Sequence, residues 1–249
     1  MQNKKTFFIC IIMIVAIFFI GKGEVEEYKV NKKLMEELRL EQERLDSMIA
    51  EDGKASMANT LFIGDSRTVG LWEYGGLDEA DYFATVGMTS YSVLTDLVDV
   101  PGVGKMTLDE LLSTRKYDKI FIMLGINEMG YDFEQTVNKF TEVVKHVDEK
   151  QPDAFIFVES NMHVTKDFSE KHSYIKNERI DKYNDRIKKL ANDKDIFYLD
   201  VNTLFDDADG SLDQSKSSDN AHVYAKHYAE WANWLRVETA ARINSLKKN

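Results

Sequence analysis

One segment of the sequence carries a side chain suited to nucleophilic chemistry. Ser66 lies in Gly64-Asp65-Ser66, where a short apolar run ends and a helix is expected to begin. A serine hydroxyl becomes a good nucleophile only when a base removes its proton. The free N–H groups and the positive dipole end of a helix N-terminus would also favour an oxyanion there. Ser66 is therefore a candidate nucleophile, although serine is also a common helix cap.

The base in such chemistry is usually histidine, and the sequence contains five of them: His146, His163, His172, His222 and His227. Only His222 has a carboxylate three residues before it, in Asp219. A carboxylate one turn away can fix the tautomer of the imidazole and stabilise its cationic form. We predict that His222 is the base and Asp219 its orienting acid. The alternative is a surface histidine at the start of a helix.

Two further residues could stabilise a developing oxyanion. Asn127 follows a strongly apolar run, and its side-chain amide could donate a hydrogen bond. Gly87 also follows an apolar run, and without a side chain its N–H could approach the same oxygen. Asparagine and glycine are equally common in ordinary turns, so each residue alone indicates little.

The elements that must position these residues alternate along the chain. Short apolar runs predict strands at 60–63, 81–86, 119–124, 154–158 and 196–199. Periodic stretches predict helices at 90–98, 108–113, 133–150, 177–192 and 224–246. Nearly continuous apolar strands alternating with helices are typical of a parallel sheet that is covered on both faces.

Ligands of an open α/β sheet bind outside the carboxyl ends of its strands. The segments with Ser66, Gly87 and Asn127 each follow a predicted strand, and Asp219-Asn-Ala-His222 precedes the last helix. Together and in this order, they resemble the four blocks of the SGNH/GDSL hydrolase family of lipases and esterases. The resemblance covers about residues 59–249. It implies a three-layer α/β/α sandwich with a mostly parallel five-stranded sheet, similar to flavodoxin.

The resemblance also implies a mechanism. Ser66 would be the nucleophile, with His222 and Asp219 completing a Ser-His-Asp triad. The N–H groups of Ser66 and Gly87 and the amide of Asn127 would form the oxyanion hole. No cofactor and no metal is expected. An acyl-enzyme intermediate also permits transfer to an alcohol, so an O-acetyltransferase is an alternative, as is a surface carbohydrate-binding module that has lost catalysis.

The sequence departs from the family pattern in two places. Glu128 stands where the family usually has aspartate after the third-block asparagine, and we expect activity to survive this change. Arg67 stands where leucine is common after the nucleophile. It could attract an anionic substrate, although a solvent-facing helix residue is an equal alternative. The second block is the least specific, and Gly102 or Gly104 could compete with Gly87.

Residues 1–22 contain lysines but no acidic residue, and an unbroken apolar run extends from Phe7 to Ile20. The run is shorter than a usual spanning helix and fits the core of a signal peptide, but no Ala-x-Ala cleavage site comes after it. We expect a membrane anchor through residues 6–22, or else a cleaved signal. Lys4 and Lys5 would then stay in the cytoplasm, with the rest of the chain outside.

Residues 23–58 read as a charged helical stalk or linker, because a thin apolar stripe of Leu34, Leu38, Leu45 and Met48 recurs at helical spacing. A short coiled coil is the alternative, which Glu41 interrupts. Residues 59–249 then form the hydrolase domain.

Composition excludes several other classes. The 249 residues carry a net charge of −11, which argues against nucleic acid as a partner. The single cysteine, Cys10, excludes a disulfide framework and a cysteine-based zinc site. The partner expected is an ester-bearing small molecule or carbohydrate, with O-acetyl groups of cell-wall or extracellular polysaccharide as one substrate. Tyr91, Tyr131 and His163 could line the cleft, but packing explains them equally well.

Overall fold

The computed structural model describes residues 24–247, which fall into two compact units. One unit contains the residues up to Ser56 together with those from Val237 onward, and the other is Met57–Arg236. The sequence analysis assigned residues 59–249 to one domain. The boundary between Arg236 and Val237 falls within helix α9 (Ala225–Leu246). The predicted membrane segment, residues 6–22, lies outside the described part. Within residues 24–247, no helix is both long enough and apolar enough to cross a membrane.

The first unit contains the predicted charged helix, α2, at Glu24–Ser47. Its surface carries ion pairs one turn apart, such as Arg39 with Glu36 at 2.7 Å and with Glu43 at 2.6 Å. Such exposed pairs each stabilise a helix by only a few tenths of a kcal/mol. Of the predicted apolar stripe, the C-terminal members Leu45 and Met48 are buried.

The second unit is built on the predicted parallel sheet, with strand order β2-β1-β5-β6-β7. Every neighbouring pair of strands is parallel. The strands are β1 (Thr60–Gly64), β2 (Asp81–Ala84), β5 (Lys119–Met123), β6 (Phe155–Glu159) and β7 (Ile196–Leu199). A short antiparallel hairpin of β3 (Val98–Val100) and β4 (Gly104–Met106), which the sequence analysis did not predict, contains Gly102 in its turn.

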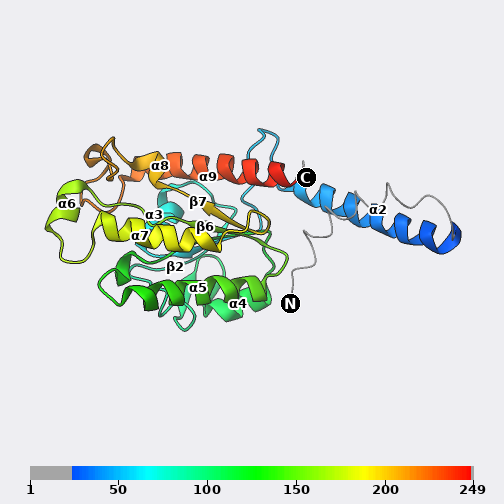
Figure 1. Ribbon diagram of the computed structural model, residues 1–249, viewed down its shortest axis with the longest axis horizontal. Coiled ribbons are helices and arrows are strands. Elements are labelled where there is room, and N and C mark those ends of the chain that lie inside the picture. The colour runs from blue at the N-terminus through cyan, green and yellow to red at the C-terminus, as the bar shows by residue number, and fades with distance from the viewer. Residues whose placement is uncertain (1–23, 248–249) are drawn as a thin grey trace. The chain divides into compact units, whose positions relative to one another are not determined.

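Helices cover both faces of this sheet, as the three-layer prediction requires (Figure 1). The α-helices are α3 (Ser66–Tyr74), α4 (Leu108–Thr114), α5 (Phe133–Lys150), α6 (Lys166–Lys171), α7 (Asn177–Ile187), α8 (Asn202–Phe205) and α9 (Ala225–Leu246). Short 3₁₀ helices lie at η1 (Ile126–Glu128), η2 (Lys188–Leu190) and η3 (Gln214–Lys216).

The helix predicted at 90–98 is wrong, because this segment forms consecutive turns and then enters β3. The Thr89 hydroxyl accepts a hydrogen bond from the N–H of Ser92 and lies 3.2 Å from the Ser92 hydroxyl. This bond resembles a helix cap, and the N–H groups of Val93 and Asp96 reach the carbonyls of Thr89 and Ser92, but the turns do not continue as a helix before β3. The buried Val93 shows that the apolar residues of the segment still pack inward.

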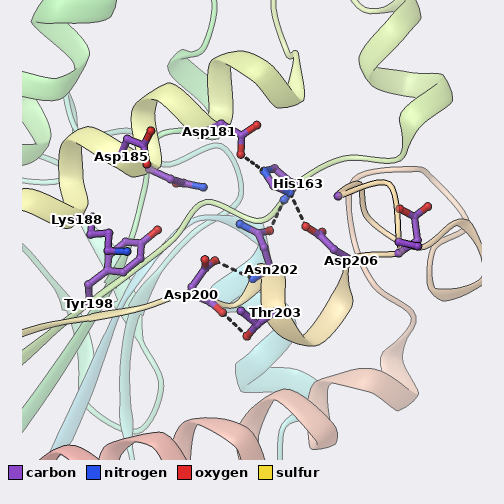
Figure 2. Close-up of a pocket in the computed structure, with 13 residues that line it drawn as sticks. His163, Asp181, Asp185, Lys188, Tyr198, Asp200, Asn202, Thr203 and Asp206 are labelled. Carbon is purple, nitrogen blue, oxygen red and sulfur yellow. Dashed lines mark hydrogen bonds and ion pairs between the residues drawn. The ribbon is translucent and has the colours of Figure 1, made fainter.

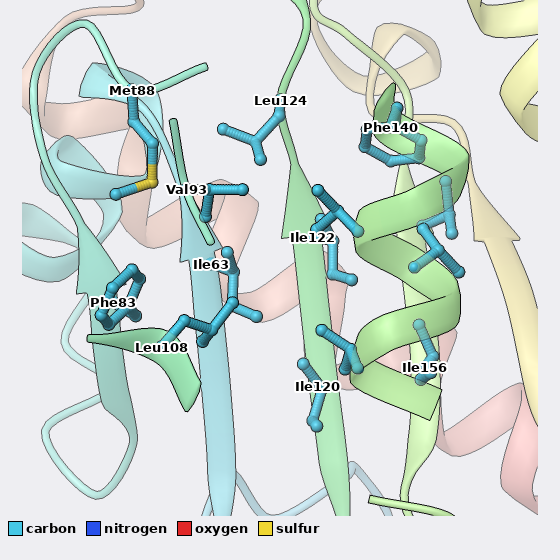
Figure 3. Packing of buried hydrophobic residues seen from close by; sticks show 14 of the residues in the cluster. Ile63, Phe83, Met88, Val93, Leu108, Ile120, Ile122, Leu124, Phe140 and Ile156 are labelled. Carbon is cyan, nitrogen blue, oxygen red and sulfur yellow. The ribbon is translucent and has the colours of Figure 1, made fainter. Parts of the chain in front are cut away.

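One face of the sheet packs against α4, α5 and α7 to form the main apolar core. Ile63, Ile120, Ile122 and Ile156 project from three neighbouring strands toward Phe140 of α5 (Figure 3). All five side chains are at most 1% exposed. Burial of such side chains contributes about 1.5–3 kcal/mol each relative to exposure.

The opposite face carries a row of five aromatic rings, one from each strand. The rings of Tyr82, Phe62, Phe121, Phe157 and Phe197 are stacked in this order, with centroids 5.1, 4.7, 4.7 and 5.4 Å apart. Each ring lies opposite its neighbour in the strand register. The five strands are therefore aligned by a single continuous row of side chains.

Candidate active site

Three of the predicted residues meet at the carboxyl end of the sheet. The Oγ of Ser66 lies 2.8 Å from Nε2 of His222, although the two residues are 156 positions apart. The Nδ1 of the same ring lies 2.7 Å from Oδ2 of Asp219. His222 and Asp219 are partly open to solvent, with side chains 37% and 54% exposed. The arrangement is a hydroxyl–imidazole–carboxylate chain, in which each contact is short enough to pass or hold a proton.

The carboxylate of Asp219 is held firmly in its charged form. Its Oδ1 accepts hydrogen bonds from the N–H groups of Ala221 at 3.0 Å and His222 at 2.8 Å. Partial burial alone would raise the pKa of Asp219, but these bonds and the His222 ring outweigh it and lower the pKa to about 2. The group is therefore ionised at neutral pH and can stabilise a protonated imidazole.

The chain enters α3 through Asp65, not through Ser66. Asp65 is the N-cap, with extended φ and ψ angles, and its side chain accepts a hydrogen bond from the N–H of Arg67 at 2.9 Å. Because Asp65 caps the helix, the hydroxyl of Ser66 is not used as a cap and can instead bond to His222. Ser66 is the first helical residue, where the backbone N–H has no acceptor within the helix.

The residues predicted as oxyanion donors lie in adjoining loops. Gly87 occupies the third position of a turn closed by the Met88 N–H on the Thr85 carbonyl, and its φ of 81° is the left-handed value such a turn requires. The side-chain amide of Asn127 donates to the carbonyl of Met88 at 3.0 Å. One amide hydrogen of Asn127 thus fixes the loop with Gly87, and the other is available.

The candidate second-block glycines lie in different parts of the fold. Gly87 follows β2, and the N–H of Thr85 donates to the carbonyl of Gly64 beside the nucleophile segment. Gly102 and Gly104 belong instead to the β3–β4 hairpin. Gly87 is therefore the glycine placed next to the end of β1.

Glu128, the residue that departs from the family pattern, is fully buried behind these loops. Its Oε1 accepts the N–H of Ser90 at 2.7 Å. Burial raises the pKa of Glu128 to about 6. Glu128 therefore supports the loop that follows Gly87 and does not face solvent.

Arg67 is not placed as the sequence analysis expected. The side chain is only 1% exposed and turns inward, so it is neither on a solvent-facing surface nor open to an anionic substrate. Its Nε and Nη2 donate to the carbonyl of Ala221 at 3.3 and 3.2 Å. The partner lies 154 positions away, which explains why no local pattern revealed it.

A separate pocket of about 460 Å³ is lined by His163 (Figure 2). Nδ1 of His163 is 2.8 Å from Asp206 and Nε2 is 2.9 Å from Asp181. Burial alone would lower the pKa of His163, but the two carboxylates outweigh it and raise the pKa. Neither Ser66 nor His222 lines this pocket, so His163 does not belong to the hydroxyl–imidazole pair.

Sequence reasoning missed the residues that hold the loop of Asp219 and His222. The N–H of Thr165 donates to the carbonyl of Asn220 at 2.9 Å, and the two side chains are bonded at 3.0 Å. Asn220 has a φ of 73°, a left-handed value that asparagine tolerates better than most residues. The Asp219-Asn220 pair was visible in the sequence, but nothing there pointed to Thr165.

Comparison with known proteins places this geometry in a family. The GDSL-like Lipase/Acylhydrolase family matches residues 62–230, which contain Ser66, Asp219 and His222. No curated protein matches the chain.

Solved structures share the fold at low sequence identity. A Streptococcus pneumoniae protein, provisionally described as a platelet activating factor, is 21% identical with a TM-score of 0.54, covering 88% of this chain and 97% of that one. A GDSL-like lipase from Bacteroides thetaiotaomicron is 12% identical with a TM-score of 0.51, covering 84% and 97%. The psychrotrophic esterase EstA from Pseudoalteromonas sp. is 16% identical with a TM-score of 0.50, covering 77% and 100%.

The family match extends from β1 into α9 and includes both ends of the Ser66–His222 contact. The parallel sheet and its two helical layers are those expected of this family. The chain therefore belongs to the GDSL-like lipase/acylhydrolase family and is an ester-hydrolysing enzyme.

Proposed function

We propose that the chain is a serine esterase that uses Ser66, His222 and Asp219 as its catalytic triad. The observation that carries the proposal is the pair of short contacts on the His222 ring, 2.8 Å to Ser66 and 2.7 Å to Asp219. A hydroxyl and a carboxylate on opposite nitrogens of one imidazole fit a nucleophile, a base and an orienting acid. The tautomer that suits this role has its proton on Nδ1, toward Asp219.

The proposed reaction has two halves. In the first, Oγ of Ser66 attacks the ester carbonyl while its proton moves to Nε2 of His222. The tetrahedral intermediate collapses, the ester C–O bond breaks, and the leaving alkoxide takes the proton from His222. In the second half, water attacks the acyl-serine with His222 again as base, which releases the acid and restores Ser66.

The developing oxyanion would be stabilised by the N–H groups of Ser66 and Gly87 and by the amide of Asn127. The support for this assignment is local geometry. Ser66 begins a helix, Gly87 is exposed in a turn, and Asn127 is tied to the residue after Gly87. Loss of one such donor typically lowers kcat by about 10²–10³.

The substrate we propose is an O-acetylated carbohydrate outside the cytoplasm, with the chain held at the membrane through residues 6–22. Two observations support it. The apolar run from Phe7 to Ile20, with lysines before it, favours export of the residues on its C-terminal side. The site is also accessible to solvent, because the side chains of His222 and Asp219 are partly exposed and Gly87 and Asn127 are exposed. Such an open site suits a small acyl group that is carried on a bulky polymer.

The test of the triad uses the full chain and its Ser66→Ala variant. Native protein should react with a fluorophosphonate probe and release aryl alcohol from a short-chain aryl ester. Ser66→Ala should do neither, while keeping the same melting temperature. Hydrolysis by Ser66→Ala at the native rate, or no reaction of the native protein, would overturn the proposal.

The substrate assignment needs its own comparison. Acetate release from an acetylated polysaccharide should exceed, per enzyme, the release of fatty acid from a long-chain ester. Added short alcohols would reveal acyl transfer as a new ester product. Preference for the long-chain ester would reject the carbohydrate assignment but leave the triad intact.

A further inference from the structure

The side chain of Arg67 is a buried cation next to the nucleophile. Its guanidinium makes two hydrogen bonds to a single backbone oxygen, that of Ala221. Ala221 directly precedes His222 in the chain, and Arg67 directly follows Ser66. One side chain therefore connects the helix that carries the hydroxyl to the loop that carries the imidazole.

The surroundings of Arg67 are unusual for a residue that only fills space. Its carboxylate neighbour Asp65 is 0% exposed, and Asp65 Oδ2 and Arg67 Nη1 are buried without a hydrogen-bond partner among residues 24–247. Burial lowers the pKa of Arg67, and the nearby carboxylates of Asp65 and Asp219 offset this only in part. A buried charge with an incomplete set of partners is unfavourable for stability, so packing alone does not account for an arginine here.

The loop that Arg67 holds is attached at other points too, among them the Asn220 side chain, which is bonded to Thr165 at 3.0 Å and to Gln214 at 3.2 Å. Within it, Asp219 accepts the N–H groups of Ala221 and His222, which shapes the loop but does not place it. The N–H of Thr165 holds the carbonyl of Asn220, and Arg67 holds the next carbonyl along the chain. Two neighbouring carbonyls are thus fixed by two different parts of the domain, and of these only Arg67 belongs to the helix of Ser66.

We infer that Arg67 is a positioning residue for catalysis, which sets the distance between Ser66 and His222 by holding the carbonyl of Ala221. The inference rests on the proposed triad. Without the two guanidinium bonds, the loop can shift relative to α3, and Nε2 of His222 moves away from Oγ of Ser66. Misplacement of a reacting group by about 1 Å can reduce the rate about 10²-fold.

The experiment compares Arg67→Met, Arg67→Lys and Arg67→Ala with the native full chain on a short-chain aryl ester. Arg67→Met should lower kcat about 10²-fold with KM within about threefold, because the ester itself does not touch Arg67. Arg67→Lys restores the charge but not the fork of donors and should recover only part of kcat. Guanidinium chloride at tens of millimolar should raise kcat of Arg67→Ala at least about tenfold by occupying the vacated space.

The matched control is Arg186→Met. Arg186 makes two hydrogen bonds to a single partner, Glu134, at 2.6 and 2.9 Å, but this pair is exposed on α7 and α5. The kcat of Arg186→Met should equal the native value, and guanidinium chloride should not activate this variant. Potassium chloride at the same concentration, added to Arg67→Ala, shows how much of any activation is due to ionic strength.

The inference fails if folded Arg67→Met keeps native kcat, if its KM rises while kcat stays, or if guanidinium does not rescue Arg67→Ala. If Arg67→Met and Arg67→Ala do not fold, Arg67→Lys decides, because native kcat in a folded lysine variant would overturn the role of the donor fork.

Fluorophosphonate labelling separates the two proposals. A native protein that does not label rejects the triad, whereas native labelling with equal labelling of Arg67→Met rejects only Arg67.

Discussion

Replacement of Asp219 by asparagine tests the triad without removing its shape. Oδ1 of the new amide can still accept hydrogen bonds from the N–H groups of Ala221 and His222, which lie 3.0 and 2.8 Å from Oδ1 in the native protein. The NH₂ group then faces Nδ1 of His222, where the carboxylate oxygen lies 2.7 Å away in the native protein. An NH₂ donor requires Nδ1 to be the acceptor. The ring proton must then move to Nε2, which points at Ser66.

A histidine protonated at Nε2 cannot accept the proton of Ser66. The expected loss in kcat is therefore about 10⁴, which corresponds to about 5.5 kcal/mol of lost transition-state stabilisation. Because hydrogen bonds lower the pKa of Asp219 to about 2, the native protein keeps this carboxylate ionised at every pH above about 4. Titration of Asp219 itself therefore makes no contribution to the pH dependence of native kcat across neutral pH.

The assay is hydrolysis of a short-chain aryl ester, together with the rate of fluorophosphonate labelling. Asp213→Asn is a close control, because Asp213 accepts the N–H and the hydroxyl of Ser215 at 2.8 Å and neither of these bonds involves a histidine. Its kcat should match the native value. A folded Asp219→Asn variant within tenfold of native kcat would refute the tautomer argument and with it the role of Asp219.

Two further predictions concern stability. Burial raises the pKa of Glu159 to about 8 from 4.5, so its contribution to stability is present below pH 4.5 and is lost as pH rises toward 8. Glu159→Gln, which still accepts the Trp231 N–H, should therefore stabilise the protein at pH 9 by on the order of a few kcal/mol but not at pH 4, as measured by urea unfolding. Equal effects at both pH values would contradict this. A Cβ on Gly70 would lie 2.3 Å from the ring of Tyr228, so Gly70→Ala should destabilise by about 1–3 kcal/mol in thermal unfolding, and an additional Tyr228→Ala change should add less than it does alone.

Much of the fold could be predicted because buried parallel strands leave a strong sequence signal. The runs that begin at Thr60 and Lys119 are apolar and end at glycine, and the strands lie where these runs predicted. The predicted helix Phe133–Lys150 has the same bounds as α5, because a capping aspartate precedes it and its apolar residues recur at helical spacing. Local chemistry was sufficient for these elements.

The contacts that could not be predicted are those between distant segments. Arg67 looked like a helix-surface residue, because its partner Ala221 lies far along the chain and is a backbone carbonyl that no side-chain pattern marks. Glu128 was expected to leave activity intact, but nothing in the sequence marked its partner, the N–H of Ser90, which lies 38 positions away. In the segment after Thr89, apolar spacing suggested a helix, but the chain forms consecutive turns and enters β3. For Arg67 and Glu128, the decisive partner lies in a distant segment that no local pattern marks.

The aromatic row across the sheet has a consequence for how the strands are kept in register. Each ring is stacked on its neighbour, and the contacts extend without a gap from Tyr82 to Phe197. The outer rings come from the edge strands β2 and β7, so the complete row needs every strand in its final register. A strand shifted by one residue would turn its ring to the other face and split the row. A register error in any one strand therefore removes ring contacts with its neighbours on both sides, so the row opposes slippage across the whole sheet.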